Sequence, residues 1–167
     1  ADSTAVYNFR LDVRAVRGPA TVRLIANAQE LPEQTFFNNE LNLSFTAPDI
    51  TTPPVLDVAF DGIHILNGDI VAPRPEILVD VKYEDKRRPL TDPGKVQVLL
   101  TPPGASAAQV VNMADANLIH FVPDSAAGRT RVTYRPGAVD ALADGIYKLE
   151  VQAQDMSGAQ AGLRRYV

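Results

Sequence analysis

Three carboxylates, Glu84, Asp85 and Asp155, are the side chains whose type and position come closest to those of a chemical site. In EILVDVKYED, the apolar residues Ile77, Val79, Val81 and Tyr83 occupy every second position, and Asp85 is the next residue in this series, that is, it has the same parity. Asp155 likewise continues the parity of the apolar residues in YKLEVQA. Because side chains alternate between the two faces of a strand, each Asp is predicted at the exit of a strand, on its inward side.

These carboxylates have two interpretations. Converging oxygens would suit Ca²⁺, which binds through many oxygen ligands, so Glu84, Asp85 and Asp155 form a candidate calcium site. Alternatively, each Asp accepts hydrogen bonds from backbone N–H groups of its own turn, and the segment DMSG at 155–158 is typical of such a turn. We favour the turn, because calcium sites usually have a denser acidic cluster. We therefore predict no cofactor, with calcium as the alternative.

The two histidines give no support for catalysis. His64 lies between two isoleucines, and His120 lies in LIHFVP. If Ile63 and Ile65 face the core, alternation turns His64 to solvent as a surface residue. Neither histidine has ligands at metal-site spacing, and the two cannot form an HExxH pair. No serine lies in a G-x-S-x-G motif, so we predict no catalytic residue and no enzyme.

The pair Phe36-Phe37, followed by Asn38-Asn39, is a candidate for stacking on a sugar. A tight turn explains the asparagines, because Asn tolerates left-handed backbone conformations. Adjacent strand residues face opposite sides, so one ring is predicted to face inward. The chain has no tryptophan, the usual platform for carbohydrate.

Composition excludes several classes of protein. The chain has 167 residues, 46% hydrophobic and 22% charged, which is ordinary for a globular protein. A net charge of −4 and the lack of a basic stripe argue against nucleic-acid binding. Without cysteine there are no disulfides, zinc-thiolate sites or cysteine nucleophiles. No apolar run reaches membrane-spanning length, so we predict no membrane insertion, and we interpret the chain as a piece of a longer protein.

The dominant hydrophobic period is two, as in Tyr147-Leu149-Val151-Ala153, which predicts half-buried antiparallel strands and an all-β fold. Prolines and glycines fall mostly between these runs, at the spacing of a β-sandwich. The predicted strands are 5–16, 19–28, 40–47, 55–60, 76–84, 95–101, 108–113, 117–122, 129–135, 145–155 and 162–167.

A proline-bearing segment, PDITTPP at 48–54, divides the chain, because it cannot continue a central strand. We predict a partial β-sandwich of three strands over 1–48, a linker over 49–54 and an immunoglobulin-like antiparallel sandwich over 55–167, its last strand truncated if the chain is cut there. The three upstream strands are too few to close a sandwich alone. The downstream runs suit one immunoglobulin-like domain.

The closing segment DGIYKLEVQAQDMSG, residues 144–158, resembles the last hairpin of bacterial immunoglobulin-like repeats. In such a sandwich the second and sixth strands run in the same direction. The resemblance therefore implies that Asp85 and Asp155 lie at one end, beside the B–C and F–G loops that antibodies use for binding.

A more specific resemblance lies in FDGIHILNGDIVAPRPEILVDVKYED, followed by VTYRPG and DGIYKLEVQAQD. It is similar to a module of large surface proteins exported by type IX secretion, some with a gingipain-type cysteine peptidase domain upstream. Residues 6–47, with an E-x-x-x-x-NN turn, look like the end of a CARDB-like domain. The resemblance implies a secreted, cell-surface spacer whose partners are neighbouring domains of the same chain. The alternative is an adhesion module that binds a cell-surface glycan or protein through the B–C/F–G loops.

The stretch FDGIHILNGDIVAPRPEI, residues 60–77, has the strongest appearance of a motif, and we interpret it as turns. Asp61-Gly62 is predicted to end or kink a strand, and Asn67-Gly68 to supply a tight reversal. The prolines further along keep the chain extended before the next strand. Ile63, Ile65 and Ile70 are predicted to pack against the core.

Overall fold

The structure, a computed structural model, describes residues 6–28, 30–50 and 52–167. Within these ranges it contains ten strands and one three-residue 3₁₀ helix, Pro93–Lys95, which confirms the all-β prediction. No helix in the described ranges has the length and apolar character needed to cross a membrane. The chain divides into two compact units, Ala1–Asp49 and Ile50–Val167, here called the N-terminal and C-terminal units.

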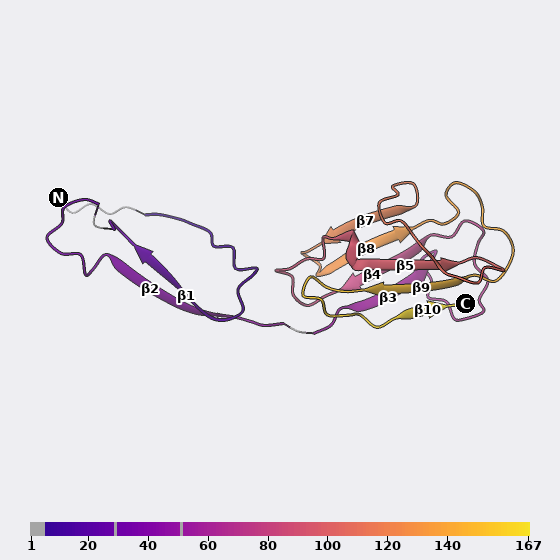
Figure 1. Cartoon of the computed structure of the whole chain (residues 1–167), viewed down its shortest axis with the longest axis horizontal. Coiled ribbons are helices and arrows are strands. Elements are labelled where there is room, and N and C mark those ends of the chain that lie inside the picture. The colour runs from indigo at the N-terminus through magenta and orange to yellow at the C-terminus, as the bar shows by residue number, and fades with distance from the viewer. Residues whose placement is uncertain (1–5, 29, 51) are drawn as a thin grey trace. The chain divides into compact units, whose positions relative to one another are not determined.

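The N-terminal unit is built on a two-stranded antiparallel ribbon, with β1 at Gly18–Ile25 and β2 at Glu40–Ala47 (Figure 1). Gly18 pairs with Ala47, and Ile25 pairs with Glu40. This register places apolar residues opposite one another on one face of the ribbon. They are Ala20, Val22 and Leu24 on β1 and Phe45, Leu43 and Leu41 on β2.

The predicted strand at 5–16 is wrong over its described part, residues 6–16, which contain no strand. Tyr7, Phe9 and Leu11 are 84%, 56% and 53% exposed. Alternation makes a segment suitable for a strand, but an isolated extended segment gains no ladder of hydrogen bonds to offset its loss of backbone entropy. The ribbon therefore has two strands where the pattern predicted three.

The first sheet of the C-terminal unit has the order β3-β4-β8-β7, with every neighbouring pair antiparallel. Its strands are β3 (Val55–Phe60), β4 (Ile77–Lys82), β7 (Ile119–Asp124) and β8 (Arg129–Tyr134). The second sheet has the order β10-β9-β5-β6. Its strands are β5 (Val96–Thr101), β6 (Gln109–Val110), β9 (Lys148–Ala153) and β10 (Arg164–Tyr166). Each of the eight downstream runs predicted from periodicity overlaps one of these strands, and β7 extends two residues beyond the run predicted at 117–122.

Both sheets contribute to one hydrophobic core. Val79 and Val81 on β4, Val98 on β5 and Val151 on β9 are completely buried members of the same cluster. Val79 and Val81 are spaced by two along their strand, as the alternation of inward and outward side chains requires. Fully burying an aliphatic side chain of this size stabilises the fold by about 1.5–3 kcal/mol, so this cluster is the main source of stability.

Two contacts join the edges of the two sheets. Arg164 Nε on β10 donates to the carbonyl of Leu56 on β3 at 3.2 Å. The Tyr166 ring packs edge-on against the Phe60 ring, with 5.2 Å between their centroids. β3 and β10 are therefore held together although they belong to different sheets.

The pairing register defines two ends of the C-terminal unit. Val55 pairs with Lys82 at one end, here called the Val55 end, where loops 83–95 and 154–163 lie. Tyr166 pairs with Leu149 at the other end, here called the Tyr166 end, where loops 61–76 and 135–147 lie. Figure 1 shows the chain arriving at β3 on one side of this unit and leaving β10 on the other.

The turns predicted in 60–77 are present. Asp61, Gly62 and Gly68 have positive φ angles of 50°, 80° and 90°. The prediction that all three isoleucines pack is wrong, because Ile63 is 67% and Ile70 is 99% exposed, whereas Ile65 packs against the core.

The turn at Asp61-Gly62 accounts for the exposure of Ile63. Phe60 and Ile63 exchange two backbone hydrogen bonds, of 2.8 and 2.9 Å, across this turn. The chain therefore folds back on itself, and strand parity no longer determines which residues face inward.

Candidate functional site

Asp85 lies at the Val55 end, inside loop 83–95, and is 8% exposed, as its inward parity predicted. Its carboxylate accepts hydrogen bonds from Arg87 Nε at 2.9 Å and from Arg88 Nε at 2.7 Å. The backbone N–H of Arg87 also donates to it at 3.2 Å. Its oxygens are therefore engaged by two guanidinium groups and one turn N–H.

The electrostatics of Asp85 are a balance of opposing effects. Burial favours the neutral acid, but hydrogen bonds from Arg87 and Arg88 outweigh it and lower the pKa of the carboxyl. Arg88 is more buried than Arg87, with 13% against 25% of its side chain exposed. Its Nη1 is buried and has no hydrogen-bond partner in the described part of the chain. The arrangement fixes the loop and leaves Asp85 without a free oxygen for catalysis.

Asp155 forms the turn that its sequence predicted. Its Oδ1 accepts from the backbone N–H groups of Ser157 at 2.7 Å and Ala159 at 2.9 Å, and from the Ser157 hydroxyl at 2.6 Å. This pattern is an Asx turn extended by one further bond. The carboxylate organises loop 154–163.

Glu84, the third candidate calcium ligand, accepts a hydrogen bond from the Thr52 hydroxyl at 2.9 Å. Across residues 6–28, 30–50 and 52–167, no group of three or more His, Cys, Asp or Glu residues gathers in a way that could hold a metal ion. Each of the three carboxylates thus has a protein partner, and no calcium ligand set is assembled from them.

His64 is 71% exposed and its Nε2 lies 2.7 Å from Asp57 Oδ1. Lys82 Nζ donates to the other oxygen of Asp57 at 2.6 Å, and this bond, followed by that of His64, lowers the pKa of the Asp57 carboxyl. The predicted solvent orientation of His64 is confirmed, although the turn at Asp61-Gly62, not strand alternation, produces it. His120 is exposed on β7. Neither histidine has a serine or cysteine to activate among its described contacts.

The carbohydrate candidates lie in the N-terminal unit. Phe36 and Phe37 are 37% and 86% exposed and lie outside the strands, so the expectation that one ring faces inward is not met. The predicted turn is present, since Asn39 N donates to the Phe36 carbonyl at 3.2 Å. The asparagines are not left-handed, because the positive φ in this region belongs to Asn27.

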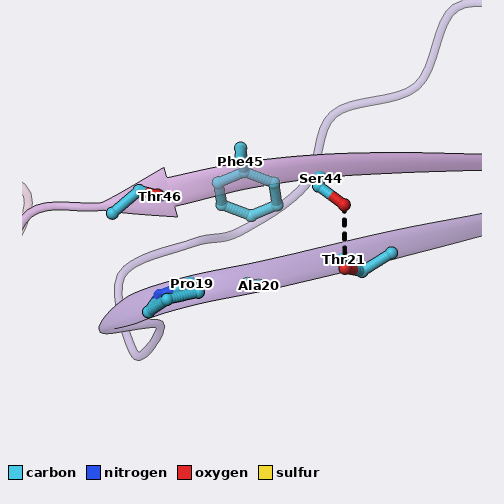
Figure 2. A pocket seen from close by; sticks show the side chains of 6 residues that line it. All are labelled: Pro19, Ala20, Thr21, Ser44, Phe45 and Thr46. Carbon is cyan, nitrogen blue, oxygen red and sulfur yellow. Dashed lines mark hydrogen bonds between the residues drawn. The ribbon is translucent and has the colours of Figure 1, made fainter.

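A shallow hollow on the ribbon is formed by adjacent residues of β1 and β2 (Figure 2). It is lined by Pro19, Ala20, Thr21, Ser44, Phe45 and Thr46. Figure 2 shows the Thr21 and Ser44 hydroxyls turned toward one another across the strands, at 3.2 Å. No ionisable side chain lines the hollow, so it offers no general acid or base.

The larger concavity lies at the Tyr166 end of the C-terminal unit, in a groove of about 630 Å³. Loops 65–73 and 142–147 form its walls, and strand-end residues of both sheets, including Phe60, Leu100 and Leu149, form its floor. This volume lies within the range of ordinary ligand pockets, roughly 300–1,000 Å³. Apolar side chains and proline rings make up most of the lining.

Hydrogen bonds hold the groove open between its two loops. Leu142 N donates to the Pro73 carbonyl at 2.8 Å, and Arg74 Nη1 donates to the Gly137 carbonyl at 3.1 Å. Gly137 packs so closely that a Cβ there would lie 2.7 Å from the Pro73 carbonyl oxygen. Because one loop is fastened to the other, the groove exists before any ligand arrives.

The sequence patterns do not predict this groove. They predict that Ile63, Ile65 and Ile70 pack against the core, and they place the alternative binding site at the opposite end, beside Asp85 and Asp155. The available signal was the excess of apolar residues in two long connections, loops 61–76 and 135–147, which a short turn does not require.

The chain matches no protein-family model, no curated protein and no solved structure.

Proposed function

We propose that this chain is a non-catalytic spacer module of a large secreted cell-surface protein and that its C-terminal unit is an immunoglobulin-like sandwich. The strand orders β3-β4-β8-β7 and β6-β5-β9-β10 support the second part. They correspond to A-B-E-D and C′-C-F-G, the arrangement of such domains with one additional short strand.

One observation carries the spacer proposal: the chain enters and leaves the C-terminal unit at opposite ends. Val55 begins β3 opposite Lys82, and Tyr166 ends β10 opposite Leu149. A module with this geometry holds the segments attached to its two ends apart by its own length. A domain whose two connections emerge on the same side could not do so.

The edge strands of the two sheets have features that hinder pairing with a strand of another molecule, as expected of a module that remains monomeric. β7, at one edge of the first sheet, contains Pro123, and β6, at one edge of the second, is only two residues long. Proline and short edge strands hinder pairing with another chain. The spacer proposal requires this property, because side-by-side copies on a cell surface would otherwise aggregate.

Secretion, the CARDB-like origin of residues 1–48 and a parent protein with a gingipain-type peptidase domain rest on the sequence resemblances alone. In this proposal the partners of the chain are the neighbouring domains of the same polypeptide, and any catalysis belongs to another domain. Binding through the B–C/F–G loops has less support, because the groove lies at the Tyr166 end.

Single-molecule force spectroscopy tests the spacer proposal. The chain has no cysteine, so Val55→Cys and Val167→Cys supply unique attachment points. A force applied between these two points acts along the lengths of β3 and β10. Two contacts between the strands then have to break in shear, that of Arg164 with Leu56 and that of Tyr166 with Phe60. We expect one cooperative unfolding event.

A second variant pair, His120→Cys and Thr133→Cys, pulls β7 and β8 apart from the open end of their hairpin and serves as the control. In this geometry the backbone hydrogen bonds between β7 and β8 break one after another, so the hairpin should open at a clearly lower force than the shear geometry requires. Equal forces in both directions, or gradual extension without a cooperative event, would overturn the spacer proposal.

A further inference from the structure

The groove at the Tyr166 end has exposed apolar side chains at its mouth. Ile70 is 99% and Ile146 is 73% exposed, and they belong to different walls. Val71 is 38% exposed in the same wall as Ile70. Scattered apolar residues are normal on a protein surface, but apolar residues gathered around a preformed groove indicate a binding site.

The loops that bear this groove are strongly acidic. Loops 61–76 and 135–147 together contain five carboxylates and two arginines, a net charge of −3 with His64 neutral. The carboxylates are Asp61, Asp69, Glu76, Asp140 and Asp144. The whole chain has a net charge of −4, so most of its excess negative charge lies in these two loops.

Both arginines of these loops are already engaged. Arg135 donates to Glu76 at 2.6 and 2.8 Å, and Arg74 donates to the Gly137 carbonyl. Asp69 and Asp144 line the groove, and no Lys or Arg is among its lining residues. Asp144 has no hydrogen-bond or ion-pair partner within the described part of the chain. The field at the groove mouth therefore favours a positively charged ligand.

We propose that this groove binds a peptide segment of another protein that carries apolar side chains flanked by lysine or arginine. The apolar side chains would occupy the groove floor beside Phe60 and Leu100. The basic side chains would approach Asp69 and Asp144 at the rim. The proposal goes beyond the spacer function and does not depend on it.

The two parts of the site have different roles. Burial of apolar surface supplies most of the affinity, because rim ion pairs in contact with water add little. The acidic rim instead raises the association rate and selects basic over acidic peptides. Removing the apolar mouth should therefore cost more affinity than removing the charges.

Selection from a phage-displayed library of random dodecapeptides tests the proposal. The complete chain is immobilised, and peptides retained by the variant Ile70→Ser/Ile146→Ser are discarded. We expect enriched sequences to combine large apolar residues with a net positive charge. Synthetic copies should bind the parent chain and lose at least about tenfold in affinity with the double serine variant.

Charge is tested separately with Asp69→Asn/Asp144→Asn. Asparagine is a conservative replacement at the first position because Asp69 accepts a hydrogen bond from Leu66 N at 2.8 Å, and an amide oxygen can also accept it. We expect a loss of roughly two- to tenfold, and a similar loss for the parent chain at high salt. Val55→Ser, which alters a 55% exposed apolar residue at the opposite end, should leave the affinity unchanged.

Amide chemical shifts of the complete chain locate the bound peptide. Titration should move the resonances of Leu142, Ile146 and Tyr147, and the thermal denaturation of each variant shows whether it remains folded. Selected peptides that are acidic, that bind the serine variant equally well, or that shift loops 83–95 and 154–163 instead would overturn the proposal. Failure to select any groove-dependent peptide would overturn it as well.

Discussion

Arg88 donates from Nε to the Asp85 carboxylate at 2.7 Å, and only 13% and 9% of these two side chains are exposed. Arg87 binds the same carboxylate from the more exposed side. The loop is also attached to the neighbouring turn, since Tyr83 N donates to the Gly128 carbonyl at 2.9 Å and Lys86 Nζ to the Ala126 carbonyl at 3.0 Å. Loop 83–95 is therefore ordered by a nearly buried charge cluster.

Asp85→Ala should destabilise the C-terminal unit by about 2–4 kcal/mol, because it leaves Arg88 buried without its counter-ion. Arg88→Met keeps the length of the side chain and removes the charge. The double variant Asp85→Ala/Arg88→Met should recover part of the loss, since neither charge then remains buried. Urea denaturation of the four proteins gives the coupling, and additive effects would contradict a direct interaction.

The depressed pKa of Asp85 makes stability depend on pH. In the folded state burial opposes its ionisation, but Arg87 and Arg88 lower its pKa below the ordinary value of 3.8. Between the two pKa values the unfolded state binds more protons, so stability falls as pH falls. The contribution is complete well above pH 3.8 and is lost as pH decreases through the folded-state pKa. The free energy of unfolding should therefore decline below about pH 5.

Asp85→Asn removes this titration and should give a shallower decline over the same range. Asp57, whose pKa is lowered by Lys82 and then by His64, remains in both proteins and contributes a slope of the same sign. Identical slopes for the parent chain and Asp85→Asn would show that Asp85 titrates normally.

The inward position of Asp85 could be predicted from the sequence, whereas its partners could not. Strand parity extends one step beyond Tyr83 and so places Asp85 correctly. Arg87 and Arg88 reach back only because the chain turns sharply after Glu84, where Lys86 N bonds to the Glu84 carbonyl at 2.9 Å. Periodicity describes straight segments, so it contains no information about contacts made across a turn.

The same limit explains the errors elsewhere. The alternation of apolar and polar residues over 5–16 predicts a strand. A strand is stable only when it pairs with the edge of another strand, and the alternation does not show whether such an edge is available. Hydrophobicity predicts that Ile63, Ile65 and Ile70 pack against the core, yet Ile70 is 99% exposed. The groove depends on two loops from distant parts of the sequence, fastened together by Leu142 and Pro73.

Gly137→Ala should destabilise the chain by about 1–3 kcal/mol, because the new Cβ would meet backbone atoms that cannot move freely. It would lie 2.7 Å from the Pro73 carbonyl oxygen and 2.9 Å from Arg74 Cα. Gly162→Ala is the matched control, since its Cβ meets nothing within 4 Å. Thermal denaturation should show a lower midpoint for Gly137→Ala alone, and equal midpoints would contradict the close packing of the two loops.

Thr130→Val should cost about 1–3 kcal/mol although it preserves shape, because it removes the hydrogen bond from the Thr130 hydroxyl to the Leu90 carbonyl at 2.7 Å. Both residues are completely buried, so water cannot replace the lost donor. Thr133→Val is the control: Thr133 lies on the same strand, is 8% exposed, and its hydroxyl has no hydrogen bond within the described residues. Urea denaturation should therefore separate the two variants, with Thr133→Val close to the parent chain. A Thr130→Val protein as stable as Thr133→Val would mean that the Leu90 carbonyl finds another donor and that the hydroxyl does not anchor loop 83–95 to β8.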